Sequence, residues 1–205
     1  MTSDTLLIDA PAIDPLLRER WSSRVFDAHH ELADAELARL LEAARWSPSA
    51  GNSQPWAFIV TRRGESGHAA LLETLSRGNT GWVPAASAVL LALHRVGDDE
   101  DPSLTFSDYA AYDLGQAVAH LTVQAESMGL ATHQFAGFDH GRAAELFRVP
   151  AAWKVTTAIA VGTRPAPAEL ELADPALLER EAAPRVRKEL SEFVFTDRFG
   201  APRWS

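Results

Sequence analysis

Two short clusters of cationic side chains are the residues of this chain best suited to hold an anion. The first is R-W-S-S-R, Arg20 to Arg24, in which serines separate two arginines; the second is R-V-R-K, Arg185 to Lys188, near the other end. Guanidinium groups bind phosphate through paired hydrogen bonds, and hydroxyls add further donors. Either cluster alone is as well explained by a solvated basic surface. Together they could enclose one phosphate.

Other kinds of catalytic site have little support in the sequence. There is no cysteine, which excludes thiol catalysis, disulfides and thiolate metal sites. The seven histidines show no metal-binding spacing such as H-E-x-x-H, and each is interpreted as a surface or hydrogen-bonded side chain. No nucleophile elbow, Walker A loop or strand-linked G-x-G-x-x-G is present. We therefore predict neither a metal site nor a catalytic side chain.

Composition narrows the class of protein and its partners. The length of 205 residues fits one domain, and 46% hydrophobic with 23% charged residues is ordinary for a soluble globular protein. The formal net charge of −9 disfavours nucleic acid as a partner, because phosphate backbones need a basic surface. The N-terminus does not resemble a signal peptide, and the longest apolar run, 85–93, is too short to span a bilayer. The expected location is cytoplasmic, with no membrane partner.

Hydrophobic periodicity predicts the elements that must position these side chains. We expect an alternation of helices and strands, which is typical of a mixed α and β domain. Asp34 is a candidate N-cap for the first helix, and Gly129 a C-cap for the longest one. The longest helix is apolar over much of its circumference and should be buried. Helices are expected over 36–46, 68–75, 107–128 and 142–147, and strands over 56–62, 85–93 (less probably a buried helix), 133–138 (strand or loop) and 156–161.

Three segments do not follow this periodicity. P-S-A-G-N-S-Q-P-W, Pro48 to Trp56, is longer than a tight turn and is either a connector or a surface shaped to lie against something. The acidic run in 97–103 is interpreted as a solvated turn. From Gly162 onward Pro, Ala and Glu dominate, so 164–205 is expected to be an extended arm or a linker to the terminal basic segment. We predict one domain over 1–205 that includes this arm.

Several motifs, taken in order, resemble those of a known family. R-x-S-x-R-x-F-D is followed by P-S-x-x-N-x-Q-P-W-x-F-I-V, G-N-T-G-W-V-P-A-A-S, A-G-F-D, I-A-V-G and finally R-V-R-K-E-L-S-E. This series is similar to the flavin-dependent nitroreductase family and covers the chain from about Arg20 to Glu192. The resemblance implies an α+β fold: a mixed, mainly antiparallel sheet flanked by helices, with a long central helix at a homodimer interface and a C-terminal arm.

The resemblance also implies an activity. Such a protein would bind FMN and transfer hydride in a ping-pong cycle from NADH or NADPH, through flavin N5, to a nitroaromatic, quinone or similar acceptor. The alternatives are other flavin chemistry on the same fold, such as reductive dehalogenation or flavin breakdown, and a non-catalytic flavin-binding dimer. The sequence does not distinguish NADH from NADPH, nor does it identify the acceptor.

The family motifs assign roles to particular residues. The phosphate would be held from both cationic clusters, the pyrimidine edge by Asn79, and N5 would lie beside the Ala136–Gly137 backbone. The Pro48–Asn52 segment would come from the other subunit. The complete set of implied cofactor-binding residues is Arg20, Trp21, Ser22, Arg24, Pro48, Ser49, Ala50, Asn52, Asn79, Trp82, Phe135, Ala136, Gly137, Arg185 and Arg187.

Two residues depart from the family pattern. Ala136 stands where many members carry Glu, and Trp82 where a Lys often approaches the N1 edge of the flavin. Loss of that cation should make the site less stabilising to anionic reduced flavin, and an indole in its place could narrow the pocket or stack in it.

Overall fold

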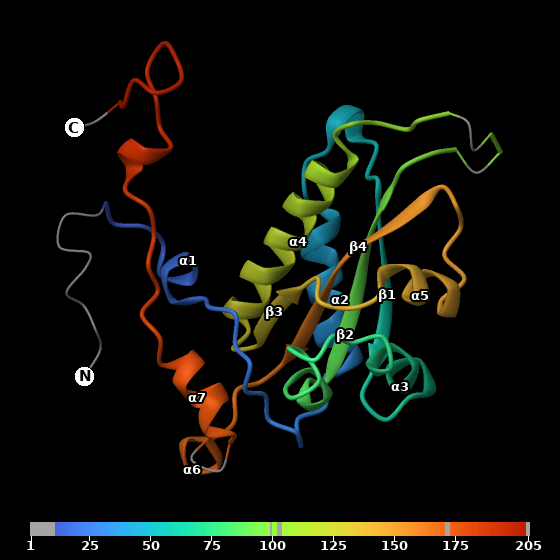
Figure 1. Cartoon of the computed structure of the whole chain (residues 1–205), viewed down its shortest axis with the longest axis vertical. Coiled ribbons are helices and arrows are strands. Elements are labelled where there is room, and N and C mark those ends of the chain that lie inside the picture. The colour runs from blue at the N-terminus through green and yellow to red at the C-terminus, as the bar shows by residue number, and fades with distance from the viewer. Residues whose placement is uncertain (1–10, 99, 102–103, 171–172, 204–205) are drawn as a thin grey trace. The chain divides into compact units, whose positions relative to one another are not determined.

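The computed structural model describes residues 11–98, 100–101, 104–170 and 173–203. Their contacts divide the chain into a large unit, Pro11–Glu181, and a second unit that includes the segment from Ala182 onward. The large unit contains all four strands and the R-W-S-S-R segment (Figure 1). Of the acidic run 97–103, residues 99, 102 and 103 lie outside the described residues.

An antiparallel sheet forms the centre of the large unit. Its strands are β1 (Trp56–Arg62), β2 (Ala88–Arg95), β3 (Ala131–Phe135) and β4 (Trp153–Gly162), in the spatial order β1-β2-β4-β3. All three neighbouring pairs are antiparallel. The α+β class and the antiparallel sheet predicted from the sequence are confirmed. The last strand is longer than predicted at both ends, because it pairs with β2 along its whole length across a register shift at Ala92/Leu93.

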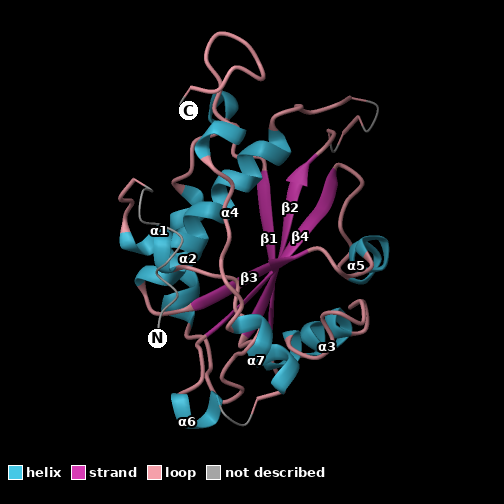
Figure 2. Cartoon of the chain, turned by 60° about the vertical axis from the view of Figure 1, so that its left-hand side comes forward, coloured by secondary structure: helices cyan, strands magenta, loops and turns pink. Residues whose placement is uncertain are grey.

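Helices cover both faces of the sheet (Figure 2). On one face lie α2 (Asp34–Arg45) and α4 (Ala110–Ser127); on the other lie α3 (Ser66–Leu72) and α5 (His140–Leu146). Neighbouring side chains on β2 serve opposite faces, as the pleat requires. Leu90 belongs to the core that contains Leu40 of α2 and Leu121 of α4, whereas Leu91 belongs to the core that contains Leu71 of α3.

The long helix is buried as predicted. The predicted starts of two helices, however, differ from those in the structure. Leu114, Leu121 and their stripe are buried, and Gly129 ends α4 with a left-handed φ of 74°. The first residue of α4 is Ala110, with Tyr109 at the N-cap position, three residues after the predicted start at 107. Asp34 is likewise inside α2, where its carboxylate binds Arg62. In the described part of the chain, no helix is long and apolar enough to cross a membrane.

Short elements complete both units. In the large unit these are α1 (Pro15–Glu19), two 3₁₀ turns, η1 (Ala50–Asn52) and η2 (Val83–Ala85), and, after β4, α6 (Pro167–Leu170) and α7 (Pro175–Glu181). Leu177 of α7 packs against the core on the α3 side, so the part of the predicted 164–205 arm up to Glu181 belongs to the large unit. The second unit contains η3 (Leu190–Glu192) and a turn in which the rings of Phe195 and Phe199 lie 4.6 Å apart.

Candidate functional site

The R-W-S-S-R segment runs beside β3 as an extended chain. Ser22 forms a parallel bridge with Thr132 at the start of that strand. Side chains of an extended segment alternate, so Arg20, Ser22 and Arg24 belong to one side and Trp21 and Ser23 to the other. Burial agrees for the serines, since Ser22 is exposed and Ser23 is buried. Among the described residues, the Arg24 guanidinium has no ion-pair partner. These three residues can therefore present cations and a hydroxyl on a shared edge.

The opposite side of the same segment binds a carboxylate of the chain itself. Glu181 at the end of α7 accepts hydrogen bonds from Trp21 Nε1 (2.7 Å), from Ser23 Oγ (3.1 Å) and from the backbone amide of Arg24. The guanidinium of Arg164 lies 3.4 Å from the centroid of the Trp21 ring. The indole predicted to contact the cofactor is thus engaged within the protein. Sequence reasoning missed Glu181 because one glutamate in an acidic segment some 157 residues away carries no pattern.

The peptide after β3 is fixed by hydrogen bonds to its carbonyl oxygens. The Gly137 oxygen accepts from Ser76 N (2.9 Å) and from Asn79 Nδ2 (2.9 Å), which joins two residues that the sequence predicted for one site. The Ala136 oxygen accepts from Phe138 N (3.0 Å), and His140 Nε2 lies 3.1 Å from it. The carbonyl oxygens of both Ala136 and Gly137 are therefore fixed by contacts within the protein.

The amide groups of the same peptide are available to a ligand. No described residue accepts a hydrogen bond from the N–H of Ala136 or of Gly137, and Ala136 is exposed. A Cβ at position 137 would lie 2.5 Å from Asn79 Nδ2 and 2.7 Å from Ser76 Oγ, so only glycine allows this close packing. The result is a strand end whose two amide donors are bound by no other described residue.

Trp82 lies in the core rather than in an open site. Its ring is 1% exposed and packs against His133 (4.3 Å between centroids) and against Phe135 (5.3 Å, edge to face). Its Nε1 donates to Asn79 Oδ1 (3.1 Å) and Gly78 O (3.2 Å). The expectation that this indole would narrow the pocket or stack in it is wrong for its side chain, because the ring fills the space beneath the Asn79 loop. Through this hydrogen bond the buried indole holds the side-chain amide of Asn79 in place.

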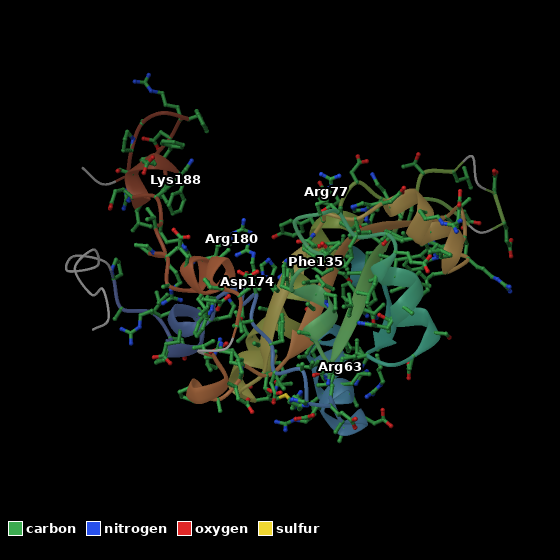
Figure 3. The ribbon with its side chains drawn as sticks, turned by 60° about the horizontal axis from the view of Figure 1, so that its bottom comes forward. Arg63, Arg77, Phe135, Asp174, Arg180 and Lys188 are labelled. Carbon is green, nitrogen blue, oxygen red and sulfur yellow. The ribbon has the colours of Figure 1, made fainter. Side chains whose placement is uncertain are left out.

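Phe135 is also a core residue. Its side chain is 7% exposed and lies between the rings of Trp82 and Phe138, 5.3 Å and 5.9 Å away. Figure 3 shows it among the packed side chains at the centre of the large unit. Any contact with a cofactor at this position would come from the backbone of Phe135.

A buried histidine links the phosphate segment to this core. His133 Nδ1 donates to the carbonyl oxygen of Ser23 at 2.9 Å, while its ring packs on Trp82. Burial lowers the pKa of His133, and the nearby charge of Arg24 acts in the same direction. A neutral ring here avoids placing a buried cation behind the phosphate segment.

The Pro48–Trp56 segment and Ser47 just before it each make a contact with α4. Asp113 Oδ2 accepts from Ala50 N at 3.0 Å, and Ser47 Oγ lies 2.7 Å from His120 Nδ1. The backbone of the segment is irregular, since Gly51, Asn52 and Gln54 all have positive φ. Ala50 and Asn52 are exposed. Among the described residues, no hydrogen bond or ion pair joins 48–52 to the Asn79–Gly137 pair.

The two halves of the predicted site lie at opposite ends of β3. Ser22 pairs with Thr132 at its start, and Ala136 follows its end. At about 3.3 Å per residue, the two positions are about 13 Å apart along the strand. Arg185 and Arg187 belong to the second unit.

Comparisons with known proteins identify the group to which this arrangement belongs. Residues 17–96 match the model of the nitroreductase family. A solved structure described as an oxidoreductase containing FMN is 30% identical, with a TM-score of 0.86 over 98% of this chain and 100% of the other. The chain belongs to the nitroreductase family.

Other related proteins match more locally or have names that give no activity. An uncharacterised 15.4 kDa protein of Mycolicibacterium smegmatis is 40% identical over 153 residues, covering 71% of this chain and 98% of its own. An oxygen-insensitive NADPH nitroreductase of Helicobacter pylori is 49% identical over 45 residues, which is 22% of this chain and 21% of that enzyme. The match thus spans about a fifth of the Helicobacter enzyme.

Proposed function

We propose that this member of the nitroreductase family is an FMN-dependent oxidoreductase that transfers hydride from NADH or NADPH to a nitroaromatic, quinone or similar acceptor. The observation that carries the proposal is the Ala136–Gly137 backbone: its amides bind no described residue, while its carbonyl oxygens are held by Ser76, Phe138 and Asn79. The name of the FMN-containing relative and that of the NADPH nitroreductase support the cofactor and the reductant.

The residues present fit the phosphate end of FMN. Arg20, Ser22 and Arg24 share one side of an extended segment, and Ser22 is exposed there. Guanidinium groups and a hydroxyl are the donors that a phosphate dianion prefers. We propose that these three residues bind the phosphate, while the roles of Arg185 and Arg187 stay a prediction from the family motif.

The other end of β3 fits the isoalloxazine ring. Bound FMN supplies the centre that accepts a hydride from the reduced nicotinamide and passes it to the acceptor. The amides of Ala136 and Gly137 would donate to the ring near N5, and Asn79 would contact its pyrimidine edge. Because these donors are fixed before binding, they stabilise the electron-rich reduced form without reorganisation. Positioning of the hydride donor, rather than proton transfer from a side chain, would set the rate.

We propose a homodimer in which α4 forms the interface. The outward face of α4 carries exposed or partly exposed residues of mostly small or aromatic type: Tyr112, Gly115, Ala119, His120 and Val123. A hollow beside them is lined by Leu16, Ala43, His120, Val123, Gln124 and Ser127. Because Asp113 and His120 also hold the 47–50 segment, packing two copies of α4 would bring each Ala50–Asn52 turn toward the other subunit.

The absorbance spectrum of the purified, FMN-reconstituted protein tests this proposal. We expect a yellow protein that NADH or NADPH bleaches without oxygen, and whose colour returns when menadione is added. A protein that takes up no FMN would refute the proposal. Bound flavin that neither nucleotide bleaches would point instead to other flavin chemistry or to a non-catalytic flavin-binding dimer.

A further inference from the structure

The Glu181 carboxylate makes several long-range hydrogen bonds to the R-W-S-S-R segment. It receives donors from three residues of the segment: the indole of Trp21, the hydroxyl of Ser23 and the backbone amide of Arg24. Hydrogen bonds to an ionised carboxylate are stronger than those between neutral groups. Both carboxylate oxygens take part, since Oε2 accepts from the two side chains and Oε1 from the amide.

These contacts determine which side of the segment faces a ligand. The segment touches β3 through the isolated bridge at Ser22 and through the bond from His133 Nδ1 to the Ser23 carbonyl oxygen, and both contacts involve its backbone rather than its side chains. Glu181 holds the side chains of residues 21 and 23, and alternation then leaves Arg20, Ser22 and Arg24 on the opposite side. The bond to the Arg24 amide fixes the backbone from which that guanidinium projects.

A cation–π contact adds to this attachment. Arg164 lies 3.4 Å above the Trp21 ring, and its Nη2 is 3.4 Å from Glu126 Oε2 on α4. Trp21 is therefore held at its edge by α7 and on its face by a residue linked to α4. Glu181 and Arg164 thus converge on one side chain of the segment.

We propose that Glu181 is a positioning residue for the phosphate end of the cofactor site, acting through Trp21, Ser23 and the Arg24 amide. This inference rests on the proposed function. Figure 3 labels Arg180, the residue before Glu181 on α7.

The test compares two ligands that differ only in the phosphate. We would measure the Kd of FMN and of riboflavin, by quenching of flavin fluorescence, for the wild type, Glu181→Gln and Glu181→Ala. Glutamine retains one acceptor oxygen but loses the second and the charge. We expect the Kd of FMN to rise about tenfold for Glu181→Gln and further for Glu181→Ala, with the Kd of riboflavin changed less than twofold. Glu179→Gln, an exposed neighbour on α7, is the matched control and should leave both values unchanged.

Two further measurements separate positioning from general loss of structure. Trp21→Phe keeps a ring beneath Arg164 but removes the indole N–H, and should raise the Kd of FMN severalfold without affecting riboflavin. In the FMN-free protein, the Trp21 indole N–H resonance should move upfield in Glu181→Gln. Equal weakening of FMN and riboflavin, or no change in either, would overturn the inference while leaving the proposed function in place. A wild type that binds neither flavin would overturn both.

Discussion

The side-chain amide of Asn79 donates a 2.9 Å hydrogen bond to the carbonyl oxygen of Gly137, and the same amide accepts one from Trp82 Nε1 at 3.1 Å. Asn79 thus cannot move freely away from the glycine that it contacts. A buried aromatic residue, a loop amide and a strand-end peptide form one connected unit. The geometry of the proposed ring-binding end depends on all three.

Gly137→Ala should destabilise the protein and weaken FMN binding. The new Cβ would lie 2.5 Å from Asn79 Nδ2 and 2.7 Å from Ser76 Oγ. We expect a loss of about 1–3 kcal/mol in the free energy of unfolding, measured by urea denaturation. Adding Asn79→Ala removes one obstructing atom, so the double variant should lose less than the sum of the single ones. Gly78→Ala, where a Cβ meets nothing within 4 Å, is the control.

Removal of the Arg24 guanidinium should weaken binding of FMN but not of riboflavin. Charge-assisted bonds to a phosphate contribute about 1.5–3 kcal/mol, or about 10- to 100-fold in Kd. Arg24→Ala should show this loss in a fluorescence titration, and added salt should reduce the difference from wild type. Arg39→Ala, an exposed arginine of α2, should leave the Kd unchanged. An equal effect of the two substitutions would place the phosphate elsewhere.

The attachment of the Ala50 amide to α4 should be measurable through Asp113. Asp113→Ala removes the acceptor of a 3.0 Å bond, whereas Asp113→Asn keeps an oxygen in the same place. We expect a loss of about 1 kcal/mol for alanine, faster amide exchange at Ala50 and weaker FMN binding, all largely restored by asparagine. Asp108→Ala, exposed before the same helix, is the control. Unchanged exchange at Ala50 in the alanine variant would contradict this assignment.

A charge on the outer face of α4 should separate the subunits and release flavin. Ala119 is exposed on that face, so Ala119→Arg should shift the sedimenting species toward the 22.3 kDa monomer. Ala69→Arg, at an exposed position of α3 on the other side of the sheet, should not. A monomer that keeps its FMN would contradict a shared site.

Stability should fall as the solution becomes acidic, in part because of two buried histidines. Burial lowers the pKa of both His68 and His133 from the ordinary value of 6.5, although the backbone at Thr61 and Ser23 opposes the shift. The unfolded chain then binds more protons, so stability that is complete above about pH 6.5 is lost as the pH falls toward the folded-state values. Urea midpoints measured from about pH 7.5 to about pH 5.5 should fall less steeply for His68→Leu than for wild type, while His29→Leu, at an exposed site, should follow wild type.

Local patterns predicted the fold class because each depends on neighbours in sequence. β1 begins and ends where predicted, at Trp56 and Arg62, and α4 is buried along its predicted stripe. Helix starts were less accurate, since Asp34 can bind Arg62 across the fold instead of capping. The end of the large unit at Glu181 was not predicted, because it depends on contacts with side chains far away in the sequence.

The candidate site could be predicted in its residue types but not in the direction of its side chains. Family motifs drew attention to Trp21, Trp82 and Phe135, yet all three side chains are engaged inside the protein. Asn79 and Gly137 were assigned separately, and only the structure reveals the bond between them. No pattern in one sequence encodes contacts over 157 residues, such as that of Glu181 with Arg24.

The alternation in residues 20–24 means that substitution and deletion should have very different effects on this segment. Replacing one residue changes one contact and leaves its neighbours in place. Deleting one residue exchanges the two sides, because side chains on an extended backbone repeat every second position. The arginines would then turn toward Glu181, and the indole toward solvent. Variants with altered flavin affinity should therefore be sought among point substitutions here, whereas the length of this segment should tolerate no change.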